Sequence, residues 1–248
     1  MAKIEEMLLP TINAAMSIKG VKVNREEFLR KELHGKVAPD IIERAISYGT
    51  KNADIPFEII DKLADNCISS RSSLAVTESF LSGLPGGLVG LLGGSAVDII
   101  QFYANFLNLA QKLMYLYGFR DIKELDSSQE DIMIVMLGAA SGVEIANKYV
   151  NILLSKSASK WLEKIAAEEA GKSAVKILAE KVLIAFGKKS TARITQSQLA
   201  RFFSKAVPFI GGAICGTITA FTFKPMARRL NKSLADGYTT EVSIIKIS

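Results

Sequence analysis

The chain has 248 residues, of which 49% are hydrophobic and 23% are charged, and its formal net charge is +6 at pH 7. This length and composition allow a sizeable core, in one large or two small domains, and they exclude disorder as the main state. The two cysteines, Cys67 and Cys215, lack a C-x-x-C spacing, which argues against a zinc or redox site and suits a reducing compartment. Glu5 and Glu6 stand where an export signal carries basic residues, and Pro10 breaks the apolar run, so we expect a cytoplasmic protein without an export signal.

Helical periodicity, with apolar residues three and four positions apart, runs through almost the whole chain. Glycines mark helix ends, as at Gly49 and Gly118. The pattern predicts helices, in chain order, over residues 39–49, 56–81, 95–117, 126–141, 156–186, 195–205 and 206–235. Strand-like alternation is limited to a tail segment, 241–248. We therefore expect an all-α protein, a compact multi-helix bundle forming one domain over residues 1–248, with residues 1–35 packed on it.

Segment 83–94, GLPGGLVGLLGG, combines six glycines with one proline and no charge. Glycine allows tight turns and the close approach of two backbones, and small residues four positions apart line up a groove for a second helix. The candidates for a turn and for close packing are Pro85, Gly86, Gly87, Gly90, Gly94, Gly212 and Gly216. Gly138 and Gly142 share the same spacing.

Residues 206–223 are 18 uncharged positions, which reaches the lower limit for a membrane span. Half of them are Gly, Ala or Thr, and Pro208 lies near the start. This weak net hydrophobicity favours a buried or re-entrant hairpin over a true span.

The predicted helix after residue 95 carries a polar stripe on an otherwise apolar and aromatic surface. Its members are mostly uncharged, whereas a helix that faces bulk water usually carries more Lys and Glu. Two interpretations stay open: the stripe lines a partly dry cavity and binds a ligand or another helix, or it is an ordinary solvent-exposed face. The candidate ligand-binding residues are Asp98, Gln101, Asn105, Asn108, Gln111, Lys112 and Tyr115.

The positive charge is concentrated in the second half of the chain. Residues 156–205 hold 11 basic and 4 acidic side chains, and residues 206–248 hold 5 and 2. Such asymmetry is typical of attraction to phosphate groups, and a solvated lysine face is the alternative. The candidate contacts with an anionic surface are Lys156, Lys160, Lys164, Arg228, Arg229 and Lys232. Few aromatic residues lie among the basic ones, which argues against nucleic acid as the partner.

Patterns typical of catalysis are weak. The single histidine, His34, lies in a polar stretch and is interpreted as a surface residue. The string AAEEAGKS at 166–173 lacks the first glycine of a phosphate-binding loop and follows no strand. We expect no metal and no cofactor, and a protein that is not an enzyme. The alternative is an enzyme acting on a lipid-like substrate with Asp98 as acid or base.

Five segments, in this order and at similar intervals, resemble the EcsC family of bacterial proteins. These segments are FLRKEL (28–33), ESFLSGLPGG (78–87), VDIIQF (97–102), QKLMYLYGF (111–119) and VPFIGG with TFKPMARR (207–229). The matching positions are Gly83, Pro85, Gly86, Gly87, Asp98, Gln101, Gln111, Tyr115, Tyr117 and Gly118. The likeness covers most of the chain and is strongest from Glu78 to Phe119.

The resemblance implies a mainly helical bacterial protein close to membrane traffic, because the family is named after an operon that also encodes an ABC transporter. It brings no catalytic residue with it. Together with the charge pattern, it favours a non-enzymatic protein that associates with the inner membrane face or binds an apolar, lipid-like ligand, with an ABC transporter or another membrane protein as a further partner.

Overall fold

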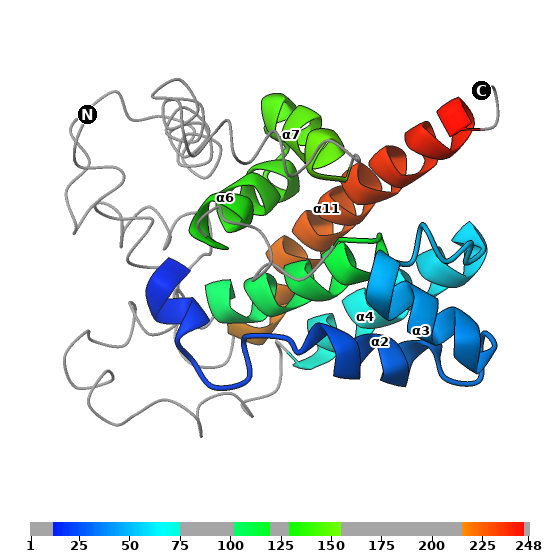
Figure 1. Cartoon of the computed structure of the whole chain (residues 1–248). Helices are drawn as coiled ribbons and strands as arrows, with labels where there is room; N and C mark the ends of the chain where they lie inside the picture. Colours follow the sequence, from blue (N-terminus) through cyan, green and yellow to red (C-terminus); the bar gives the residue numbers. More distant parts are fainter. Residues whose placement is uncertain (1–11, 75–101, 120–128, 155–214, 246–248) are drawn as a thin grey trace.

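The computed structural model describes residues 12–74, 102–119, 129–154 and 215–245, and these ranges contain helices and no strand, which confirms the all-α prediction (Figure 1). The helices are α2 (Arg25–Leu33), α3 (Pro39–Tyr48), α4 (Phe57–Leu74), α6 (Gln129–Ala140), α7 (Glu144–Leu154) and α11 (Cys215–Ile245). A short helix spans 12–16, and a longer one spans 102–116. We call the latter the central helix.

Local chemistry sets several helix ends. The side chain of Asn24 caps α2 by accepting a hydrogen bond from the Glu27 amide at 3.2 Å. Helix α3 begins at Pro39, whose missing N–H costs nothing in a first turn, and it ends before Gly49. The central helix is followed by Gly118, with φ +95°, a value that favours glycine. The predicted helix over 39–49 and the predicted end at Gly118 are thus confirmed.

The core face predicted for α4 is also confirmed, with Ile60, Leu63 and Ile68 at most 1% exposed. Two other expectations are wrong. Residues 241–245 belong to α11 and not to a strand, because a strand needs a pairing edge and none exists among the described residues. Gly142 follows α6 with φ +78° and open space around it, so it cannot form a helix groove with Gly138.

The central helix lies in the middle of the described fold. Its residues 103–111 and 113–116 are all buried, and α11 crosses it, with α6 and α7 on one side and α2, α3 and α4 on the other (Figure 1). Edge-to-face ring contacts join Phe223 of α11 to Phe102 and Phe106, with centroids 6.0 and 6.1 Å apart. One hydrophobic core therefore includes residues from every described range.

The described part of the N-terminal segment, from residue 12, contributes side chains to this core. Ile12, Ala15, Val21, Leu29 and Leu33 are each 0% exposed. Fully burying a large aliphatic side chain contributes about 1.5–3 kcal/mol, so this segment contributes substantially to the stability of the bundle. Residues 1–11 lie outside the described residues. One domain over the whole chain stays a prediction.

Candidate functional site

The polar stripe on the central helix is buried. Asn105, Asn108, Gln111 and Tyr115 are between 2% and 4% exposed, and Lys112 is half-buried. An ordinary solvent-exposed face is therefore the wrong interpretation for these residues. Asp98 and Gln101, the other two members, lie outside the described residues.

Two amides of the stripe bind the chain's own backbone. Asn108 Nδ2 donates hydrogen bonds to the carbonyl oxygens of Gly20 and Val21, at 2.9 and 3.1 Å. Gln111 Nε2 donates to the Val21 oxygen at 3.0 Å, and Gln111 Oε1 accepts from the Val23 amide at 3.1 Å. These contacts hold the loop before α2 against the central helix, so the partners of both amides belong to the protein itself.

Arg71 of α4 reaches the same stripe from the other side. It is 9% exposed, and its guanidinium donates to Asn105 Oδ1 at 3.4 Å and to Asn108 Oδ1. Burial lowers the pKa of Arg71 from its ordinary value, because desolvation disfavours the charged form. Asn108 therefore connects three parts of the fold: the central helix, α4 and the N-terminal loop.

Among the stripe residues that the structure describes, Lys112 is the one that reaches the surface. Its Nζ lies 5.7 Å from the ring centroid of Phe28 on α2, a cation–π distance. Burial lowers the pKa of Lys112, and the nearby charge of Arg71 lowers it further. Of the predicted ligand-binding residues that the structure describes, Lys112 is therefore the one placed to meet a molecule from outside.

The basic residues of α11 lie on its exposed face. Lys224, Arg228, Arg229 and Lys232 are exposed, whereas the residues that alternate with them belong to the core. Arg228 lies 3.6 Å from the carboxylate of Asp65 on α4, and both side chains are more than half exposed. The other predicted contacts, Lys156, Lys160 and Lys164, lie outside the described residues.

The glycine candidates can be placed only in part. Gly216 lies in the first turn of α11, and Pro85, Gly86, Gly87, Gly90, Gly94 and Gly212 lie outside the described residues. A close helix contact occurs instead at Gly237, where an added Cβ would lie 2.6 Å from Asn151 Oδ1 and 2.8 Å from Leu154 Cδ1 of α7. Gly237 has no glycine or alanine four positions away, so the spacing of glycines and alanines did not single it out.

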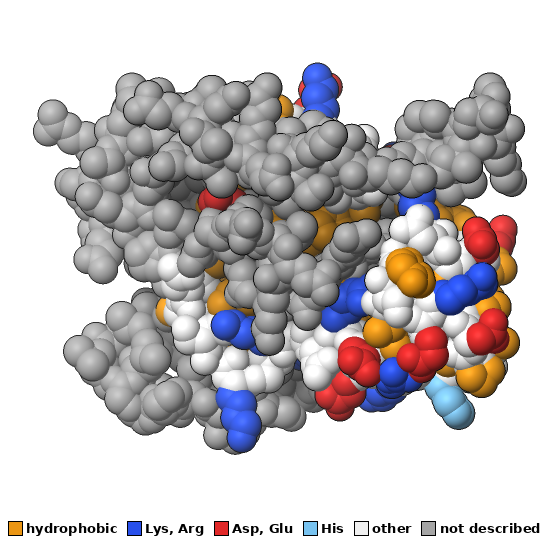
Figure 2. Space-filling model, viewed as in Figure 1, with side chains coloured by type: hydrophobic (Ala, Val, Ile, Leu, Met, Phe, Trp, Pro, Cys, Tyr) orange, Lys and Arg blue, Asp and Glu red, His pale blue; other side chains and the backbone are white. Residues whose placement is uncertain are grey.

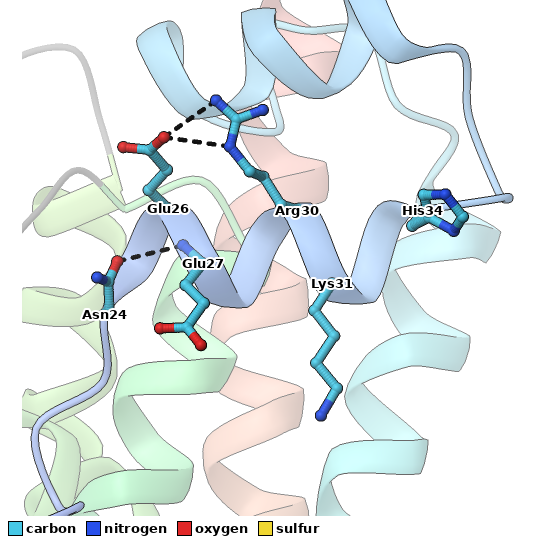
Figure 3. A pocket seen from close by; sticks show the side chains of 6 residues that line it. All are labelled: Asn24, Glu26, Glu27, Arg30, Lys31 and His34. Carbon is cyan, nitrogen blue, oxygen red and sulfur yellow. Dashed lines mark hydrogen bonds and ion pairs between the residues drawn. The ribbon is translucent and has the colours of Figure 1, made fainter.

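A shallow groove of about 520 Å³ follows the outer surface of α2 (Figure 3). It is lined by Asn24, Glu26, Glu27, Arg30, Lys31 and His34. Acidic and basic side chains are interspersed over this surface, with the histidine exposed at its edge (Figure 2). Charges of both signs compensate one another here, so the groove has no clear preference for one ligand charge.

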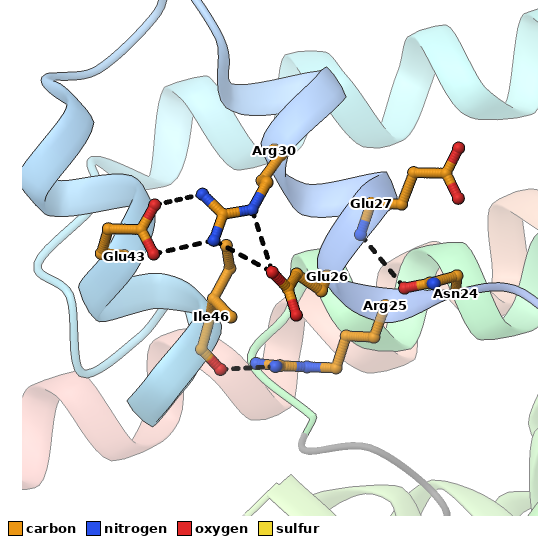
Figure 4. A network of polar contacts seen from close by, with 7 residues as sticks. All are labelled: Asn24, Arg25, Glu26, Glu27, Arg30, Glu43 and Ile46. Carbon is orange, nitrogen blue, oxygen red and sulfur yellow. Dashed lines mark hydrogen bonds and ion pairs between the residues drawn. The ribbon is translucent and has the colours of Figure 1, made fainter.

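A polar network joins α2 to α3 beside this groove (Figure 4). Arg30 binds Glu43 through two nitrogens and also binds Glu26, and its hydrogen bonds to Glu43 lower the pKa of the Glu43 carboxyl. The neighbouring Arg25 is 7% exposed and donates to the carbonyl oxygens of Ala45, Ile46 and Phe119, at 2.9, 2.6 and 3.0 Å. Arg25 has a structural role that the sequence analysis missed.

Comparisons of the chain with family models, curated proteins and solved structures found no match. Within the described ranges, no group of three or more His, Cys, Asp or Glu side chains comes together as a metal ion would require. No helix in the same ranges has both the length and the hydropathy needed to cross a membrane.

Proposed function

We propose that this protein attaches peripherally to an anionic membrane surface and does not catalyse a reaction. The resemblance to the EcsC family points in the same direction, and the proposed location is the cytoplasmic face of the inner membrane. An ABC transporter or another membrane protein would then be within reach as a partner. The observation that supports the proposal best is the construction of α11.

Helix α11 joins an uncharged stretch to a basic one. Its first nine residues, 215–223, carry no charge, and four cations follow between positions 224 and 232. Lys224, Arg228 and Lys232 are spaced four apart and so lie along one face, with Arg229 beside them. All four are exposed, and their long side chains can extend toward phosphate groups.

The energies involved are sufficient for reversible binding. Each Lys or Arg near an anionic membrane contributes about 1 kcal/mol, and the attraction decays over a Debye length of about 8–10 Å. The ion pair of Arg228 with Asp65 is exposed, and such pairs contribute about 0–1 kcal/mol, so a lipid phosphate can compete for this arginine. Four cations on one helix face therefore provide a useful share of the binding energy.

An enclosed lipid-like ligand is the less favoured version of the proposal. The amides that would have recognised such a ligand, on Asn108 and Gln111, already bind the backbone of residues 20–23. Attachment through α11 does not require these amides to be free. The central helix then serves as a structural element.

Flotation of the protein with lipid vesicles tests the proposal. We expect binding to vesicles with about 30% phosphatidylglycerol, weaker binding to pure phosphatidylcholine, and partial release at high salt. The variant Arg228→Gln, Arg229→Gln, Lys232→Gln should lose part of the salt-sensitive binding. The matched control Lys19→Gln, Lys22→Gln, Lys62→Gln removes the same charge from other exposed positions and should keep it. A wild-type protein that does not float with anionic vesicles at low salt would rule out the proposed attachment.

A further inference from the structure

The groove along α2 is lined by two rows of side chains. Glu26, Arg30 and His34 form one row, and Glu27 and Lys31 form the other, with the members of each row four residues apart (Figure 3). Rows of this kind are the ridges through which two helices interlock, because the ridge of one helix lies in the groove of the other. The outer face of α2 therefore has a shape that can receive a second helix.

The two rows differ in how their charges are balanced. In the first row, Arg30 binds Glu26 and also Glu43 of α3. In the second row, Glu27 and Lys31 are both exposed, and within the described ranges the structure shows no ion pair for either of them. A spacing of four residues would allow them to pair with each other. The second row thus presents one negative and one positive charge to another molecule.

We propose that this face of α2 is a contact between two copies of the chain, related by a two-fold axis that crosses the helix midway between Glu27 and Lys31. The two α2 helices are antiparallel in such a pair. Glu27 of each copy then lies opposite Lys31 of the other, so that two equivalent ion pairs form. The antiparallel arrangement also brings the positive end of each helix dipole close to the negative end of the other.

The charge pattern favours a second copy over other partners. An acidic peptide would pair with Lys31 but would be repelled by Glu27, and a basic peptide would meet the opposite conflict. The same two charges, reversed in direction by the two-fold axis, satisfy both residues at once. This inference is independent of the proposed membrane attachment, which depends on α11.

The size of the contact sets its strength. The nine residues of α2 span about 14 Å, whereas a stable interface buries about 800 Å² on each partner. Exposed ion pairs are weakened by salt. We therefore expect a weak dimer that forms at high protein concentration and dissociates as the salt concentration rises.

Sedimentation velocity of the full-length protein tests the proposal. We expect the sedimentation coefficient to rise with protein concentration at low salt, and to rise less at high salt. Glu27→Lys and Lys31→Glu each turn both ion pairs into like-charge contacts, so each should raise the dissociation constant at least about tenfold. Circular dichroism should stay unchanged, because the buried Phe28, Leu29 and Leu33 hold α2 in the core.

Two further samples separate charge pairing from damage to the helix. A one-to-one mixture of Glu27→Lys and Lys31→Glu should associate again, because one variant is then positive and the other negative at both positions. The double variant Glu27→Lys, Lys31→Glu should also form dimers, because it exchanges the charges and keeps the pairs. The matched controls are Glu58→Lys and Lys62→Glu, which have the same spacing on the exposed surface of α4 and lie outside the groove.

The controls should leave the dimer unchanged. A wild-type protein that stays monomeric at low salt would overturn the proposal. A mixture of the two single variants that does not associate would also overturn it, as would an α4 variant that weakens the dimer as much as the α2 variants do.

Discussion

Gly49 and Gly118 pack directly against each other at the point where α3 and the central helix both end. A Cβ atom on Gly49 would lie 2.7 Å from the carbonyl oxygen of Gly118, closer than real Cβ contacts allow. Gly49 also has φ +89° and ψ 151°, a combination that is essentially restricted to glycine. Next to it, the buried hydroxyl of Thr50 donates to the Leu116 oxygen at 2.7 Å. The two helix ends therefore form one tight junction.

Gly49→Ala should destabilise the protein by about 1–3 kcal/mol from backbone strain, and the clash with Gly118 should add to this. The measurement is urea unfolding followed by circular dichroism. Gly35→Ala is the matched control, because Gly35 also has a positive φ, of +71°, but has open space around it. Equal losses in the two variants would show that the contact with Gly118 contributes nothing.

Arg25→Met should cost at least about 2 kcal/mol in unfolding free energy, because it leaves three backbone carbonyl oxygens without this donor. Arg25→Lys should recover only part of the loss, since an ammonium cannot match the fork of a guanidinium. Arg30→Met is the control. Arg30 is exposed and paired with exposed carboxylates, so its loss should change stability little. A cost for Arg25→Met as small as that for Arg30→Met would refute the structural role of Arg25.

Gln111→Leu should loosen the loop before α2, because it removes the donor to the Val21 carbonyl oxygen and the acceptor for the Val23 amide. We expect faster hydrogen–deuterium exchange at the Val23 amide, and a global destabilisation of about 1–3 kcal/mol. Gln111→Glu keeps the acceptor for Val23 but loses the donor for Val21, so the Val23 amide should stay more protected than in Gln111→Leu. Unchanged exchange in both variants would mean that the loop is held by its apolar side chains alone.

Stability should fall steeply in alkaline solution. Burial raises the pKa of Tyr238 to about 12, and it also raises the pKa of Tyr103 and Tyr117. Above the ordinary tyrosine value of about 10, the unfolded chain loses these protons while the folded chain keeps them, so unfolding becomes more favourable as pH rises toward 12.

Thermal melts at increasing pH, with phenolate absorbance as the readout for ionisation, would check this dependence. Tyr238→Phe should flatten the decrease, at the cost of the hydrogen bond to the Ile55 oxygen at 3.4 Å. Tyr48→Phe removes a hydroxyl from a residue that is 60% exposed and serves as the control for the substitution itself. An identical alkaline decrease in wild type and Tyr238→Phe would show that Tyr238 does not contribute.

The features that could be predicted from the sequence are those that depend on neighbouring residues. Pro39 and Gly49 delimit α3 through their own backbone preferences, and the apolar spacing of α4 identifies its buried face. Such signals need no knowledge of the rest of the fold, which explains why the all-α class and these helix limits were correct.

The partners of the polar residues could not be predicted in the same way. Gln111 binds a backbone carbonyl oxygen 90 positions away, and Arg25 binds another 94 positions away. Nothing in the local sequence distinguishes an amide that binds the chain's own loop from one that binds a ligand, and an arginine next to two glutamates reads as a surface residue. Tertiary placement alone decides between these roles.

The position of α11 against the central helix also bears on how the chain is made. Tyr117 donates a hydrogen bond to Asn231 at 2.9 Å, across a separation of 114 residues. During synthesis from the N-terminus, the central helix leaves the ribosome long before the helix that covers its aromatic side. Its apolar surface lacks this cover in the meantime, so chains that stop before α11 should aggregate. The time at which α11 is made thus decides when the described core can close around the central helix.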